Sequence, residues 1–503
     1  MHPDHWTRLK RWSAGHSQCL RCFQAPALVF LVAGCAAAGA HDRDWQIGQA
    51  AAPGLNRADT LEPLPLSGTT DAQPAVDGST EDLVSSDGQS DRRIPPDGGS
   101  LEPYSPDLAD IGQSRDDDDS GDRVGAASDG PILVDTAGVL PALFTLLASA
   151  EAAASTSHVR ILQLGDSHTE SDAFTGTLRR ALATRFGDGG RGFVAPSVPA
   201  WDVEHSSRGP WTITRARPGA RNGVVGLGFV RATGGLPASE FTVGACGRCR
   251  VGTTASRFDV FYRSHGGSLQ YRLDADAWQP APSGSAAVLS VPVADGNHRL
   301  TVRSAGDGAI DVFGIAVERA HAGVVVESAG MIAAQAIHAR DLDWSELTRE
   351  IRERAPDLVL LAFGTNESVS LRRDPAVYER AMETLIERVR AAAPATLIGI
   401  VGPPDVMQRA GGQPGGAYQV APRLLEVVEA ARRVARTNRA LFIDLLAAMG
   451  GAGSMDTWLL ETPPLAAPDH VHLTSRGHGR LATAFATDLI RAYEAWRRAP
   501  RVR

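Results

Sequence analysis

The sequence predicts an α/β fold built on a parallel sheet and interrupted by an inserted antiparallel β-sandwich. Two observations predict the α/β part: apolar strand-like segments alternate with helix-like segments, and both kinds recur in two separate blocks, 131–205 and 322–503. A third observation predicts the insertion. Between the blocks, over residues 206–321, eight short segments with strand-like alternation are separated by Gly, Pro, Asp and Asn at hairpin spacing.

Residues 1–34 predict an export signal of the lipoprotein type. Basic residues precede the apolar run 25–32. Together with the residues that flank it, the apolar segment is about ten residues long, which is too short to span a bilayer. The run leads into Val-Ala-Gly-Cys, which resembles the lipobox of bacterial lipoproteins and implies lipidation at Cys35. The resemblance implies an exported periplasmic lipoprotein, and Ala36 favours the outer over the inner membrane. An ordinary signal peptide cut further along the chain is the alternative.

Residues 35–130 predict an acidic disordered tether. Between residues 36 and 129 there are 20 Asp and Glu against six Arg, which gives this segment a net charge of −14. The net charge of the whole chain is −8. Low hydrophobicity with one dominant charge sign does not offset the entropy cost of ordering. The rest of the chain is therefore mildly basic, at +6, and it lacks the basic-aromatic clusters typical of nucleic-acid binding.

The chain has five cysteines, and two of them are candidates for a disulfide in the folded part. Cys19 and Cys22 belong to the predicted signal and Cys35 to the lipidation site, which leaves Cys246 and Cys249. A zinc site needs about four ligands, commonly from two such pairs, so no metal site is expected. In an exported protein a local disulfide between Cys246 and Cys249 is favoured.

Ser167 follows directly after an apolar strand-like run, 159–165, and precedes a helix-like pattern that continues to Phe186. In a parallel sheet, ligands bind beyond the carboxyl ends of the strands. A serine becomes a nucleophile when an imidazole, itself held by a carboxylate, takes its proton. Asp469 and His472, three residues apart in a loop before the final helix, supply these groups. We expect Ser475 to cap that helix.

Three short motifs in this order, GDSH at Ser167, GTNE at Asn366 and DHVH at His472, resemble the signature blocks of the SGNH/GDSL hydrolases. This family contains esterases with a flavodoxin-like three-layer fold, and the resemblance covers 161–199 and 324–493. It implies that Ser167 is the nucleophile, His472 the general base and acid, and Asp469 the residue that orients His472. It further implies that the backbone amide of Ser167 and the side-chain amide of Asn366 form part of an oxyanion hole.

The remaining oxyanion donor in this family is a backbone amide in a glycine-containing block. In place of the family's Gly-x-x-Gly-Ala arrangement this chain has Gly-Met-Ile-Ala-Ala from Gly330 to Ala334. The expected donor is therefore the backbone amide of either Ala333 or Gly330. The Ala333 amide can serve only if the φ of Ala333 is negative. His168 replaces the usual leucine. For His168 and His470 a structural or substrate-contact role is favoured over a catalytic one, and the resemblance implies no metal or organic cofactor.

The GDSH form, the β insertion and the exported context resemble the peptidoglycan O-acetylesterases of Gram-negative bacteria, whose insertion is similar to a carbohydrate-binding jelly roll. The implied reaction is hydrolysis of acetyl esters on a cell-wall glycan through an acetyl-enzyme. The implied partners are the acetylated glycan and a membrane that holds the lipid anchor. No nucleic-acid partner is expected. Two alternatives stay open: an SGNH esterase, lipase or O-acetyltransferase for other acylated saccharides or lipids, and a catalytically inactive cell-wall-binding lipoprotein.

Overall fold

The computed structural model describes residues 131–153, 157–282, 286–412 and 415–500. The predicted signal, the lipidation site Cys35 and the acidic tether lie outside these residues and stay predictions. Within the described ranges, no helix is both long enough and apolar enough to cross a membrane.

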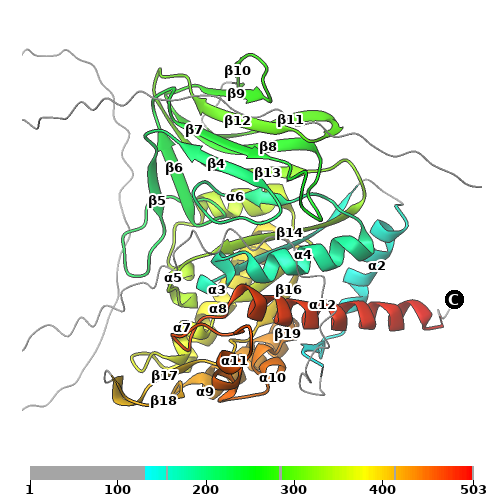
Figure 1. The fold of residues 1–503 in the computed structure, drawn as a ribbon, viewed down its shortest axis with the longest axis vertical. Helices are drawn as coiled ribbons and strands as arrows, with labels where there is room; N and C mark the ends of the chain where they lie inside the picture. Colours follow the sequence, from blue (N-terminus) through cyan, green and yellow to red (C-terminus); the bar gives the residue numbers. More distant parts are fainter. Residues whose placement is uncertain (1–130, 154–156, 283–285, 413–414, 501–503) are drawn as a thin grey trace, which may run out of the picture. The chain divides into compact units, whose positions relative to one another are not determined.

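A six-stranded sheet forms the centre of the α/β part (Figure 1). Its order is β1 (Leu133–Val134), β19 (Leu441–Ile443), β16 (Leu397–Val401), β15 (Leu358–Ala362), β2 (His158–Gly165) and β14 (Gly323–Gly330). Strand β1 pairs antiparallel with β19, and all the other neighbours are parallel. Gly165 pairs with both Gly330 and Ala362, so β2, β14 and β15 end at one rim.

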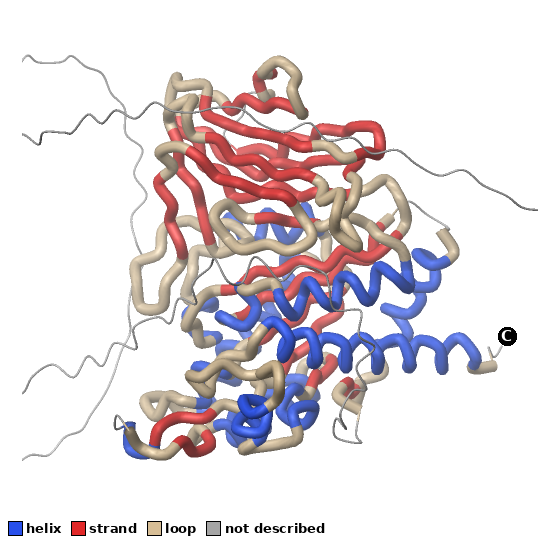
Figure 2. The backbone as a smooth tube through the Cα atoms, in the orientation of Figure 1, coloured by secondary structure: helices blue, strands red, loops and turns tan. Residues whose placement is uncertain are grey.

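Helices cover both faces of this sheet (Figures 1 and 2). One layer contains α2 (Leu140–Glu151), α4 (Ala173–Phe186) and α12 (Ser475–Arg498), and the other contains α5 (Ala336–Arg340), α6 (Ser345–Arg354), α8 (Pro375–Ala392) and α9 (Leu424–Thr437). Along β2, Ile161 packs in the hydrophobic core under α2, α4 and α12, whereas Leu162 and Leu164 pack in the core on the opposite face of the sheet. Both faces are buried, which explains why apolar residues of this strand point to both sides of the sheet. The predicted parallel α/β sheet is confirmed.

Two local expectations are wrong. The helix expected after Ser167 is divided into α3 (Ser167–Glu170) and α4, because Asp172 between them has a φ of +55°. Ser475 is the first residue of α12 and not its cap, since the Thr474 hydroxyl accepts a hydrogen bond from the Gly477 amide at 3.2 Å. Helix α8 is capped by Asp374, whose side chain accepts from the Ala376 amide at 2.7 Å.

Two antiparallel sheets lie between β2 and β14 in the sequence. The first has the order β10 (Gln279–Pro280), β9 (Leu269–Leu273), β12 (Arg299–Ser304), β7 (Glu240–Gly244), β4 (Glu204–Arg208). The second has the order β11 (Ala286–Gly296), β8 (Ala255–His265), β13 (Ala309–Glu318), β6 (Val230–Gly234), β5 (Thr212–Arg215), and β3 (Gly192–Val194) also pairs with β13. Side chains from both sheets share one hydrophobic core. In the loop after β7 a disulfide joins Cys246 to Cys249.

The second antiparallel sheet packs on helix α6 of the α/β part. Phe261 and Phe313 belong to the same hydrophobic core as Leu347 and Ile351 of α6. The buried guanidinium of Arg354 is bonded to the buried carboxylates of Glu318, on β13, and Glu327, on β14. Removal of one member would leave uncompensated buried charge, so this group ties the antiparallel sheets firmly to the α/β part.

Candidate active site

Ser167 lies at the rim where β2 ends. Asp166 caps α3 by accepting from the His168 amide at 3.0 Å, which makes Ser167 the first helical residue. Gly165 is required before this turn, because a Cβ there would lie 2.2 Å from Thr169 Oγ1 and 2.6 Å from a backbone oxygen of Ala362. Close contact between β2, α3 and β15 thus places the serine beyond the strand end, as the sequence predicts.

Ser167, His472 and Asp469 form one hydrogen-bonded chain. Ser167 Oγ lies 3.0 Å from His472 Nε2, and His472 Nδ1 lies 2.6 Å from Asp469 Oδ2. The other carboxylate oxygen, Oδ1, accepts from the backbone amides of Val471 and His472, both at 2.9 Å. The three-residue spacing therefore forms a tight turn in which Asp469 holds both the backbone and the ring of His472.

The negative charge of Asp469 beside His472 suits His472 to act as a general base. Burial would lower the pKa of His472, but the hydrogen bond and negative charge of Asp469 raise it above the ordinary histidine value. Burial would raise the pKa of Asp469, but hydrogen bonds from the His472 ring and from backbone amides hold it well below the ordinary range. Asp469 is therefore ionised at neutral pH, and its bond to Nδ1–H leaves Nε2 free to take the serine proton.

The loop after β14 lies against the same turn. The Met331 amide donates to Gly165 O at 2.9 Å, and a Cβ on Gly330 would lie 2.1 Å from the Glu170 nitrogen and 2.7 Å from Asp166 O. Gly330 is thus required for the close approach of α3 to β14. The condition set for Ala333 is not met, since its φ is +56°.

Asn366 lies in the short helix α7 (Thr365–Ser368) and faces this loop. Its Nδ2 donates to Ala334 O at 2.9 Å. A carboxamide nitrogen carries two hydrogens, so the second can point to a reacting oxygen. The structure therefore brings Asn366 and the loop 330–334 together at the rim that holds Ser167.

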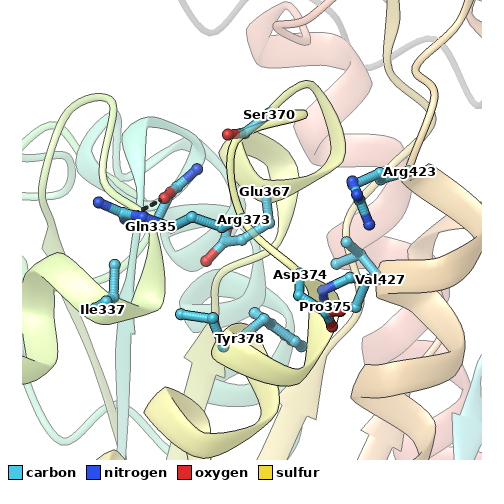
Figure 3. A pocket seen from close by; sticks show the side chains of 11 residues that line it. Gln335, Ile337, Glu367, Ser370, Arg373, Asp374, Pro375, Tyr378, Arg423 and Val427 are labelled. Carbon is cyan, nitrogen blue, oxygen red and sulfur yellow. Dashed lines mark hydrogen bonds between the residues drawn. The ribbon is translucent and has the colours of Figure 1, made fainter. Parts of the chain in front are cut away.

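Two residues that the sequence did not single out, Gln335 and Glu367, join the loop to α7. Gln335 Nε2 donates to Asn366 O at 3.0 Å, and its Oε1 accepts from Arg373 Nη1 at 2.7 Å, as Figure 3 shows. Glu367 Oε1 accepts from the Ala336 amide at 2.6 Å. Burial of the Glu367 carboxyl raises its pKa to about 8. The only sequence signal was the position of Glu367 directly after Asn366.

Three histidines lie in a row at the site. The His168 ring stacks on His472, with centroids 5.3 Å apart, and contacts His478 edge-on at 5.4 Å. His168 Nε2 lies 3.2 Å from Val471 O, which requires a proton on Nε2. His478 is buried, and burial together with the nearby His168 and His472 lowers its pKa far below the ordinary value. The sequence did not single out His478.

His470 points away from this row. Its ring stacks on Tyr418 with centroids 3.5 Å apart, and its carbonyl accepts from the Met407 amide at 2.9 Å. Both partners belong to the hairpin of β17 (Met407–Arg409) and β18 (Tyr418–Val420). These contacts are those of a structural residue.

Comparisons with known proteins point to an acylhydrolase. Residues 300–480 match the model of the GDSL-like Lipase/Acylhydrolase family, a stretch that includes Asn366, Asp469 and His472 and leaves Ser167 outside. A solved structure described as "Peptidoglycan O-acetylesterase in action, 5 min" is 28% identical, with a TM-score of 0.61 over 72% of this chain and 99% of its own. A sequence search of curated proteins gave no match.

Two further solved structures are more distant. A family two carbohydrate esterase from Cellvibrio japonicus is 9% identical over 58% of this chain and 98% of its own, with a TM-score of 0.25. Protein YXIM_BACsu from Bacillus subtilis is 14% identical over 60% and 90%, with a TM-score of 0.29. The match of residues 300–480 to the GDSL-like lipase/acylhydrolase family model, together with the likeness to the peptidoglycan O-acetylesterase structure, makes this chain a carboxylic ester hydrolase.

Proposed function

We propose that this esterase removes O-acetyl groups from a cell-wall glycan, peptidoglycan, by a Ser-His-Asp mechanism with an acetyl-enzyme intermediate. The observation that carries the mechanism is the hydrogen-bonded chain from Ser167 through His472 to Asp469. The observation that carries the substrate is the likeness to a peptidoglycan O-acetylesterase, which extends over 72% of the chain and so includes more than the family-matched part.

In the first half of the reaction, Ser167 Oγ attacks the acetyl carbonyl carbon while its proton passes to His472 Nε2. The tetrahedral intermediate collapses when the bond to the sugar oxygen breaks, and His472 returns the proton to that oxygen. In the second half, His472 takes a proton from water and the resulting hydroxide attacks the acetyl carbon. The bond from this carbon to Ser167 Oγ then breaks, His472 returns the proton to Oγ, and acetate leaves.

The developing oxyanion needs fixed donors close to Ser167. We assign the Ser167 amide, at the start of α3, and Asn366 Nδ2 to this role. The third donor comes from the loop 330–334, with Gly330 as the remaining candidate because Ala333 does not meet the condition on its φ. Gln335 and Glu367 hold this loop against α7 and so fix the distance between the donors.

The proposal includes the setting of the enzyme. Residues 206–321 form an inserted jelly-roll-like β-sandwich domain, supported by two antiparallel sheets that share a core. The chain is exported and anchored at Cys35 as a periplasmic lipoprotein of the outer membrane, supported by the sequence pattern of residues 1–36.

Acetate release tests the proposed function. The enzyme is incubated with O-acetylated murein and, in parallel, with acetylated xylan, with the Ser167→Ala variant as control. We expect faster acetate release from murein and none from the variant. Preference for xylan, or transfer of acetyl groups to an added chito-oligosaccharide in place of release, would contradict it. An inactive cell-wall-binding lipoprotein would not react with a serine-directed organophosphonate.

A further inference from the structure

The outer face of the first antiparallel sheet carries a cleft of about 560 Å³. It is lined from β4, β7, β9 and β12 and contains no residue of the site around Ser167. Neighbouring strands are about 4.8 Å apart, so the cleft crosses about 15 Å of sheet. Its volume lies within the range of ligand sites, and its length fits a polymer better than a single small ion.

A row of polar side chains crosses the floor of the cleft. Thr242 on β7 pairs with Ser206 on β4 and with Thr301 on β12, and Thr301 pairs in turn with Arg272 on β9. The hydroxyls of Thr242 and Thr301 lie 3.0 Å apart. The alternate residues of β7, such as Phe241, point to the core between the sheets. The cleft therefore offers hydroxyl groups in line, as a chain of sugar hydroxyls requires.

Four arginines line the cleft, and three of them lack a carboxylate partner among the described residues. Arg299 is paired with Glu204 at 2.5 Å, whereas no ion pair involves Arg208, Arg248 or Arg272 within the described ranges. The guanidinium of Arg272 lies over the ring of Trp278, 4.6 Å from its centroid.

Arg272 and the carboxylates of the lining determine the net charge of the cleft. The Nε of Arg272 is buried and has no hydrogen-bond partner in the described part of the chain. Among the carboxylates of the lining, Asp274 is bonded to His298 at 2.8 Å, and Glu240 has no ion pair within the described ranges. The lining thus holds four guanidinium groups against the three carboxylates of Glu204, Glu240 and Asp274, an excess of one positive charge.

We propose that this cleft binds a cell-wall glycan through its carboxylates. Guanidinium groups bind carboxylates through paired, charge-assisted hydrogen bonds, and the Ser and Thr hydroxyls between them bind sugar hydroxyls. The choice of murein rests on the proposed function, but the requirement for an anionic ligand rests on the arginines alone. The cleft holds the polymer apart from Ser167, so successive acetyl groups reach the site without full dissociation of the enzyme.

Binding is tested by co-sedimentation of the full-length chain with purified murein sacculi. The test variant is Arg208→Glu with Arg248→Glu, both exposed. The control with the same change of net charge is Arg217→Glu with Arg221→Glu, two exposed arginines in the loop after β5. Equal thermal unfolding midpoints show that both are folded. We expect at least a tenfold weaker affinity for the test variant and an unchanged affinity for the control. Equal binding by the two would overturn the proposal.

A second measurement needs no variant. Sacculi whose carboxyl groups have been converted to amides are compared with untreated sacculi, with wild-type enzyme and at two salt concentrations. We expect at least tenfold weaker binding to the amidated sacculi, and weaker binding to untreated sacculi at high salt. Equal binding to both would overturn the proposal. Acetate release from O-acetylated sacculi by the same wild-type sample tests the proposed function separately, so the two failures are distinguishable.

Discussion

The imidazole of His168 stacks on that of His472, with ring centroids 5.3 Å apart and an angle of 29° between the planes. His168 Nε2 also donates to Val471 O at 3.2 Å. The residue directly after Ser167 therefore supports the turn that carries His472. A leucine, usual at this position in the family that the GDSH motif resembles, could pack there but could not donate this hydrogen bond.

We predict that His168→Leu lowers kcat by about tenfold or less and leaves the protein folded. The reason is that one hydrogen bond is worth about 1 kcal/mol, and about 1.4 kcal/mol corresponds to a factor of ten in rate. The measurement is the steady-state kinetics of p-nitrophenyl acetate hydrolysis. His168→Gln, which keeps a donor, is expected to recover part of the loss. Complete inactivity of both variants would give His168 a catalytic role.

Asn366→Ala is expected to lower kcat about a hundredfold or more with little change in KM. In the proposed mechanism its side-chain amide acts mainly on the charge that develops in the transition state, so substrate binding should depend on it only weakly. The Asn366 carbonyl, which accepts from Gln335, is kept in the variant. A raised KM with an unchanged kcat would show that Asn366 binds substrate and is not an oxyanion donor.

Asp469→Asn tests the pH dependence. Protonated His472 cannot take the serine proton, so kcat/KM falls as the pH drops below the pKa of His472. Asp469 raises that pKa, and the asparagine should move the acidic limb of the profile to lower pH. The asparagine also favours the wrong tautomer of His472, so kcat should fall by about three to four orders of magnitude. An acidic limb that stays in place would mean that another group controls it.

Glu367→Gln tests the buried carboxyl beside Asn366. The pKa of Glu367 is raised from 4.5 to about 8, so wild-type stability is lost as the pH rises from 4.5 through about 8. Glutamine keeps an oxygen for the Ala336 amide and does not ionise. Relative to wild type, the variant should gain at least about 1 kcal/mol of unfolding free energy between pH 5 and pH 8.5, as one pKa unit is worth 1.36 kcal/mol. Urea unfolding at both pH values measures this, and a constant difference would contradict it.

The hydrogen-bonded chain of Ser167, His472 and Asp469 could be predicted from the sequence because each member follows a local signal. Ser167 comes after an apolar strand, and Asp469 and His472 share one short turn. The parallel sheet was also readable, because strands buried on both faces are continuously apolar. The family match begins at residue 300, before Val324, where the resemblance to the family was expected to resume after the insertion. The match does not include Ser167, so the GDSH motif was recognisable only in combination with the GTNE and DHVH motifs.

Other features depend on contacts between distant segments. Asp172 adopts a positive φ because its buried carboxylate binds Arg179, Arg191 and the Trp201 amide, and no local pattern reveals those partners. His478 is buried by packing against His168. The cleft on the first antiparallel sheet arises from the register of four strands, which hairpin spacing alone does not determine.

The most direct measurement is the turnover of p-nitrophenyl acetate by Ser167→Ala beside the wild-type enzyme, with matched circular dichroism spectra to show that both are folded. The proton transfer from Ser167 Oγ to His472 Nε2, 3.0 Å away, predicts that the variant has no turnover above the uncatalysed rate. Retained turnover in the folded variant would show that another group attacks the ester, and would contradict the assignment of Ser167 as the nucleophile.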